Sequence, residues 1–137
     1  MNRYSPFVWL VIALVTLTMP ACSFSATTAN ISDAKMARDQ EGKNPTKVFS
    51  PDETFYCVAS LSNAPDDTTV KAVWTAVDVE GTKPDTKIDE VSTTGGSGQL
   101  EFDLTNEGSW PVGEYKVDLF LNDEKKPART LEFEVQQ

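Results

Sequence analysis

Hydrophobic and polar residues alternate with a period of two along most of the chain after residue 46, a pattern typical of β-strands with one buried face. The alternation predicts strands near residues 47–49, 55–61, 70–76, 100–104, 115–121 and 131–135, with a weaker strand near 88–91. Residues 31–38 are ambiguous: Ser32 and Asp33 could cap a helix, but the alternation of Ala34 and Met36 with Lys35 favours an opening strand.

Turn-forming residues separate these segments at intervals of roughly ten residues, notably at 63–67, 95–98 and 122–127. No long helical period interrupts the series. Seven to eight short, two-sided strands of this kind predict an all-β fold, an antiparallel β-sandwich with one wet face on each sheet. The expected domain covers residues 31–137, which is enough chain for one such sandwich.

The first 21 residues have the pattern of a secretory signal peptide, with Arg3 and the free amino terminus ahead of an apolar run at 7–17. The small residue Ala21 followed by Cys22 resembles the lipobox of bacterial lipoproteins. That resemblance implies that Cys22 is acylated, for example with palmitate, and becomes the new amino terminus, with residues 22–30 as a tether. Ser23 is compatible with sorting to an outer membrane in a diderm cell. Ordinary cleavage nearby, after Ser25, is the alternative.

Charge and composition narrow the functional classes. The chain carries 12 basic and 21 acidic residues, a net charge of -9, and removal of residues 1–21 takes away Arg3 alone and leaves -10. Such a surface disfavours nucleic acid, which needs clustered Lys and Arg, and predicts attachment to a membrane through the lipid rather than through charge. The sequence contains no histidine, so Ser–His and Cys–His catalytic pairs and histidine metal sites are excluded.

Three residues give the predicted sandwich a more specific character. Trp74 lies on the third major strand, Cys57 lies on the strand before it, and Tyr115 opens the penultimate strand after Gly113 and Glu114. This arrangement resembles an immunoglobulin-like domain, which keeps its core tryptophan, first cysteine and tyrosine corner at these places. Val117 stands where the second cysteine would be, so Cys57 is expected to be a buried free thiol. The segment from Trp110 to Val135 resembles a carboxy-terminal pattern in exported bacterial immunoglobulin-like proteins of unassigned function.

No motif in the sequence predicts an enzyme or a cofactor. Acidic pairs at 66–67, 89–90 and 123–124 could bind Ca²⁺ if turns brought them together, but no EF-hand-like run is present. Residues 95–98 read as a hairpin turn, because the lysine and helix that a phosphate-binding loop needs do not follow.

The outer face of the predicted sheet carries the one hint of a binding site. Val73, Val77 and Val79 would point away from the core on the strand of Trp74, and Phe120 would do so on the strand of Tyr115. If these strands are neighbours, Val73, Val77 and Phe120 form an apolar patch that predicts a protein partner. We therefore expect a non-catalytic envelope lipoprotein that binds a protein or ligand. The alternatives are a structural accessory subunit of an envelope assembly and a calcium-dependent adhesion module.

Overall fold

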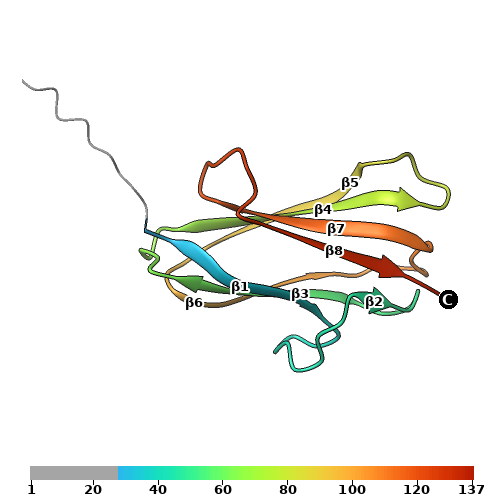
Figure 1. Cartoon of the computed structure of the whole chain (residues 1–137), viewed down its shortest axis with the longest axis horizontal. Helices are drawn as coiled ribbons and strands as arrows, with labels where there is room; N and C mark the ends of the chain where they lie inside the picture. The colour runs from blue at the N-terminus through green and yellow to red at the C-terminus, as the bar shows by residue number, and fades with distance from the viewer. Residues whose placement is uncertain (1–27) are drawn as a thin grey trace, which may run out of the picture.

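A computed structural model describes residues 28–137, so the expected signal peptide and Cys22 lie outside the described residues. Residues 28–137 form an all-β sandwich of two sheets (Figure 1). Its strands are β1 (Asn30–Ala37), β2 (Val48–Phe49), β3 (Phe55–Ser62), β4 (Thr69–Val79), β5 (Thr86–Thr94), β6 (Gly98–Leu104), β7 (Gly113–Leu121) and β8 (Arg129–Val135). The period-two alternation is thus confirmed as strand structure, and residues 31–38 form a strand rather than a helix.

The two sheets have the orders β1-β3-β6 and β2-β8-β7-β4-β5. Neighbouring strands are antiparallel except β2, which runs parallel to the end of β8. The second sheet is two strands wider than the first, and all nine residues of β5 are exposed. On β5, Val91 pairs with Ala72 and points to the inner side, yet it is 46% exposed. Strand β5 is therefore an edge strand with both faces in solvent.

An aromatic cluster fills one end of the space between the sheets. Phe55 stacks on Trp110 with ring centroids 4.6 Å apart and meets Phe133 edge-on at 4.8 Å, while Tyr115 stacks on Phe133 at 5.6 Å. The Trp110 indole donates a hydrogen bond to the Glu53 carbonyl at 3.0 Å, so the loop between β6 and β7 is held over the end of the sandwich. Each such aromatic pair contributes about 0.5–1.5 kcal/mol beyond its buried area.

The outer face of the three-stranded sheet is partly covered by the loop between β1 and β2. Gly42 adopts a positive φ of 74°, and a Cβ atom at this position would lie 2.6 Å from Cε of Lys35 and 3.4 Å from Cβ of Val58. This close approach explains why Val58 is buried although it points away from the main core. The turn at residues 39–42, closed by a hydrogen bond from the Gly42 amide to the Asp39 carbonyl, therefore also covers part of this face.

The chain enters and leaves the sandwich at opposite ends. Asn30 at the start of β1 pairs with Ser62, next to the turn at 63–68, and Figure 1 places the hairpin between β7 and β8 at this same end. The beginning of β7 and the end of β8 lie at the other end, where Gly113 pairs with Val135. Residues 28–137 form no helix long and apolar enough to cross a membrane.

Candidate functional site

The residues that suggested an immunoglobulin-like domain all lie where the sequence predicted. Trp74 and Cys57 are fully buried in the shared core, and Cys57 is a free thiol. Burial raises the pKa of Cys57 to about 12, so it stays protonated at neutral pH and has no activated thiolate. Tyr115 donates a hydrogen bond to the Pro111 carbonyl at 2.6 Å, which is the hydrogen bond of a tyrosine corner.

The predicted apolar patch is divided by the actual register. Strands β4 and β7 are neighbours, as expected, but Val73 pairs with Asp118 and Phe120 pairs with Lys71. The Lys71 ammonium lies 4.9 Å from the centre of the Phe120 ring, and Phe120 is half-buried. Val77 lies farther along β4, toward the opposite end of the sheet. The structure therefore places Val73 and Phe120 two rungs apart as diagonal neighbours on the same face, and it separates Val77 from both.

Charged groups fill the space around Val73 and Phe120. Asp118, only 9% exposed, accepts a hydrogen bond from the Thr130 hydroxyl at 2.5 Å and lies 3.5 Å from the Lys116 ammonium. Glu90 on β5 lies 3.3 Å from Lys87 and 3.4 Å from Lys71. Hydrogen bonds from these lysines, Lys87 first, hold the pKa of Glu90 below its ordinary value. This half of the outer face is a network of paired charges with two half-buried apolar side chains within it.

A β-bulge in β4 changes what the outer face displays. The pairing with β7 skips from Ala76 to Asp78, so Val77 is an extra residue without a partner on β7. Ala76 and Val79 are both buried, which leaves Val77 and Asp78 between them on the outer side. The expectation that Val79 points outward is therefore wrong, because a strict period of two does not survive a bulge.

Gly113 allows the two strands to approach closely beside this bulge. Its φ is 151°, and a Cβ atom there would lie 2.3 Å from the Asp78 carbonyl oxygen and 2.7 Å from the Val79 Cα. Only glycine fits this approach without a shift of the backbone. The glycine that precedes the tyrosine corner thus also packs against the bulge.

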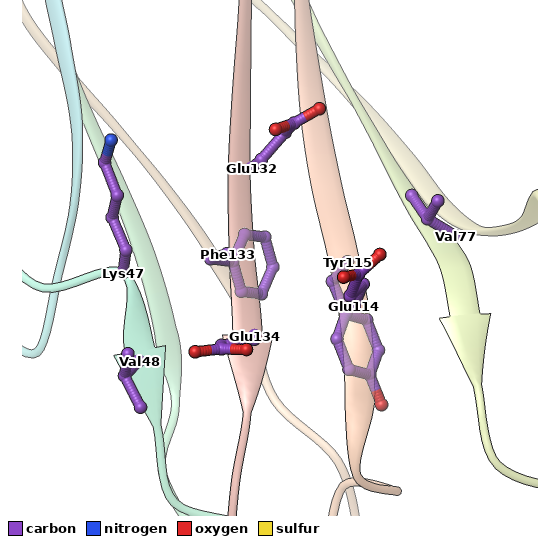
Figure 2. A pocket seen from close by; sticks show the side chains of 8 residues that line it. All are labelled: Lys47, Val48, Val77, Glu114, Tyr115, Glu132, Phe133 and Glu134. Carbon is purple, nitrogen blue, oxygen red and sulfur yellow. The ribbon is translucent and has the colours of Figure 1, made fainter.

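Next to the bulge, the outer face forms a pocket of about 250 Å³. Its lining comes from β2, β8, β7 and β4, which are neighbours in the sheet. Figure 2 shows Val77 on β4, Glu114 on β7, Glu132 and Glu134 on β8, and Val48 on β2. We call this site the outer-face pocket. Its Val77 is one of the three residues singled out from the sequence. The sequence did not predict the acidic side chains beside it, because their proximity depends on strand register.

A second and a third pocket lie elsewhere on the described surface. One, of about 510 Å³, is lined by Phe120 and Lys71 together with residues 122–125, so Phe120 and Val77 line different pockets. The other, of about 550 Å³, lies between β1 and β8 at the open side of the sandwich. Arg129 spans this side near the amino-terminal end and donates hydrogen bonds to the carbonyls of Ile31 at 3.1 Å and Ser32 at 3.2 Å.

The acidic pairs considered for calcium remain apart. Asp66 and Asp67 lie in a turn, Asp123 and Glu124 lie in another, and Glu90 is occupied by two lysines. Within residues 28–137, no three acidic or thiol side chains gather in an arrangement that could hold a metal ion.

Taken together, the two sheets, the buried tryptophan and the tyrosine corner define an immunoglobulin-like β-sandwich. An immunoglobulin-like protein from Pseudomonas aeruginosa has a similar fold, with a TM-score of 0.51 and 14% identity over 79% of this chain and 96% of that chain. At this level of identity the similarity defines the fold alone.

Two further solved structures align less well. The alkylpurine DNA glycosylase AlkC of Pseudomonas fluorescens, bound to DNA containing an abasic site analog, gives a TM-score of 0.49 and 17% identity over 80% of this chain and 30% of that chain. The C-terminal domain of Wzt gives 0.47 and 11% identity over 80% and 74%. No family model and no curated protein matches the sequence.

Proposed function

We propose that this protein is a non-catalytic lipoprotein of the bacterial cell envelope, which presents its immunoglobulin-like domain to a protein partner outside the cytoplasm. The observation that carries the proposal is the placement of the outer-face pocket. The pocket lies toward the end of the sandwich where β8 finishes, whereas the chain enters at the other end through Asn30. An anchor on the amino-terminal side would leave the pocket at the end of the domain farther from the lipid, on the side of the sheet.

The anchor itself is proposed from the sequence. Cys22 follows an apolar run and a small residue, and only residues 22–29 separate it from β1. Eight residues span at most about 29 Å, so the domain would stay close to the membrane surface. Each buried methylene of the acyl chains contributes about 0.8 kcal/mol, which makes two or three chains a stable anchor. A net charge of -10 would not hold the domain to anionic lipid.

Two potentially nucleophilic side chains of the core, those of Cys57 and Tyr115, are in states that favour a structural role over a catalytic one. The Cys57 thiol lies in the core, fully buried, with its pKa raised by that burial to about 12. The Tyr115 hydroxyl is held by the Pro111 carbonyl and its pKa is likewise raised to about 12 by burial. Both groups are protonated and turned away from solvent, which suits a structural role.

Mass spectrometry of the mature amino terminus tests the anchor. We expect a chain that begins at Cys22 and carries the mass of a diacylglyceryl group. The C22S variant should lose both the acyl mass and its place in the membrane fraction. An unmodified chain that begins at residue 26, after cleavage at Ser25, would overturn the lipoprotein proposal.

Co-purification from detergent-solubilised membranes after crosslinking tests the binding role. The wild-type protein should bring down one defined partner in stoichiometric amount. The F120D variant probes the half of the outer face that lies near the proposed anchor. Because Phe120 is half-buried beside Lys71, the melting temperature of this variant should fall by only a few degrees. A protein that sediments as a free monomer in every growth condition would contradict the proposal.

A further inference from the structure

The outer-face pocket concentrates like charges in a way that costs stability. Glu114 on β7 pairs directly with Glu134 on β8, and on its other side it pairs with Asp78 on β4. Like charges that lie directly opposite each other in a sheet are destabilising. Glu132 precedes Glu134 by two residues on the same face and adds another carboxylate to the pocket. A row of this kind departs from the pairing of charges seen on the rest of this sheet.

These carboxylates have little internal compensation. Across residues 28–137, the salt bridges use Glu53, Glu90 and Asp118, and none of them reaches Glu114 or Glu132. Lys116 on β7 pairs directly with Glu132 across the sheet, but its ammonium lies 3.5 Å from Asp118, which it neutralises instead. The carboxylate of Glu134 accepts a hydrogen bond at 2.7 Å from the side-chain amide of Gln136, and this donor is neutral. Lys47 is the one cationic residue in the lining of the pocket. The pocket therefore keeps a net negative charge with free acceptor oxygens.

Apolar surface adjoins the carboxylates inside the same pocket. Val77, the extra residue of the bulge, points outward, and Val48 on β2 is 38% exposed. A site with an apolar wall and an acidic rim is complementary to a long cationic side chain, whose methylene stem packs while its charged head meets the carboxylates. A volume of about 250 Å³ is large enough for one such side chain.

We propose that the outer-face pocket binds a lysine or arginine side chain presented by a basic segment of the protein partner. The inference rests on the proposed binding function and names the chemistry of the partner. Bulges recur beside functional sites, and here the extra residue of the bulge, Val77, forms part of the apolar wall. The strongly negative domain would attract a basic partner, and the pocket would then select the cationic side chain.

A peptide titration tests this inference on the mature protein as purified in detergent. The probe is acetyl-Gly-Arg-Gly-Arg-Gly-amide, and its control replaces both arginines by citrulline, which has nearly the same shape without the charge. Amide resonances of Val77, Glu114 and Glu132 should shift with the arginine peptide and stay in place with the citrulline peptide. Equal binding of the two peptides, or no shifts around the pocket, would overturn the proposal.

Two matched variants separate the pocket from general electrostatics. E114Q/E132Q should weaken arginine-peptide binding about tenfold, or about 1.4 kcal/mol. D66N/D67N, which changes the net charge equally at the other end of the sandwich, should change it less than twofold. The first variant should melt within a few degrees of the wild type, because E114Q removes the like-charge repulsion with Glu134 while E132Q removes the charge opposite Lys116. Equal loss in both variants would show that binding is non-specific. The titration does not depend on acylation of Cys22, so its failure is distinguishable from failure of the anchor proposal.

Discussion

The phenolic oxygen of Tyr115 lies 2.6 Å from the carbonyl oxygen of Pro111 and donates a hydrogen bond to it. This bond closes the loop between β6 and β7 against the strand that the loop feeds. Tyr115 also stacks on Phe133, so the same side chain joins the loop to the aromatic cluster. The corner thus links local chain direction to the packing of the core.

Replacing Tyr115 by Phe should lower the free energy of unfolding by about 1 kcal/mol, since the ring still packs and one hydrogen bond is lost. Urea denaturation measures the change. Tyr56→Phe is the matched control, because no hydrogen bond to the Tyr56 hydroxyl is seen in the described structure. The role of the corner would be refuted if both variants had the stability of the wild type.

Alkaline pH should destabilise the fold through Cys57. Burial raises the pKa of this thiol from 9.0 to about 12, so the native state holds the proton more tightly than the unfolded state does. The contribution of the protonated thiol to the free energy of unfolding is therefore complete below pH 9. It is lost as the pH rises from 9 toward 12, at up to about 1.4 kcal/mol per pH unit.

The free energy of unfolding, measured by urea denaturation at a series of pH values across this range, should fall more steeply with pH for the wild type than for C57A. The C57A variant has no thiol to titrate. C57A should be less stable at neutral pH, because it leaves a small void in the core. Tyr115 contributes in the same direction in both proteins, since burial raises its pKa to about 12. Parallel curves for the two proteins would show that the thiol does not titrate as expected.

Arg129 is expected to hold β1 to the other sheet. Its guanidinium donates to the carbonyls of Ile31 and Ser32, where the pairing of β1 with β3 shifts register between Ile31 and Asp33. R129M should lower the free energy of unfolding by about 1–2 kcal/mol, a figure that already allows for the exposure of Arg129 to solvent. Hydrogen exchange should speed up in the first half of β1. R129K keeps the charge but not the planar fork, so it should recover only part of the loss. Unchanged exchange in R129M would contradict this role.

We expect the charged side chains of β5 to keep its free edge from pairing with a strand of another chain. Asp89 and Glu90 lie in a strand that is exposed on both faces and pairs only with β4. Charged residues and bulges on an edge discourage pairing with another chain, and β5 also has a register shift opposite Trp74 and Thr75. D89T/E90T should self-associate, which analytical ultracentrifugation would detect. D66T/D67T, with the same loss of charge in a turn, should remain monomeric; association of both variants would assign the effect to net charge instead.

Strand positions could be predicted closely because each follows from local alternation. The segment 70–76 reads correctly as a strand with Val70, Ala72, Trp74 and Ala76 facing the core, and all four are buried. The same pattern fails three residues later at Val79, where the bulge reverses the direction of the side chain. A bulge is defined by the partner strand, and nothing in residues 77–79 alone distinguishes it from continued alternation.

The candidate site was predicted only in part for the same reason. The outward direction of Glu132 and Glu134 follows from the alternation in β8, and Val77 was singled out from β4. That Glu114 lies opposite Glu134 depends on the register of β7 against β8, which is set by the turn between them and by which residues each strand buries.

The sequence by itself determined the all-β class, the core positions and the immunoglobulin-like features around Trp74 and Tyr115, because burial on one face imposes a period of two that can be read locally. The tertiary structure alone decided that Val73, Val77 and Phe120 do not form one patch, that β5 is exposed on both faces, and that carboxylates from two strands gather beside Val77. These features arise from register and from the unequal width of the two sheets. Both are set by contacts between residues far apart in the chain.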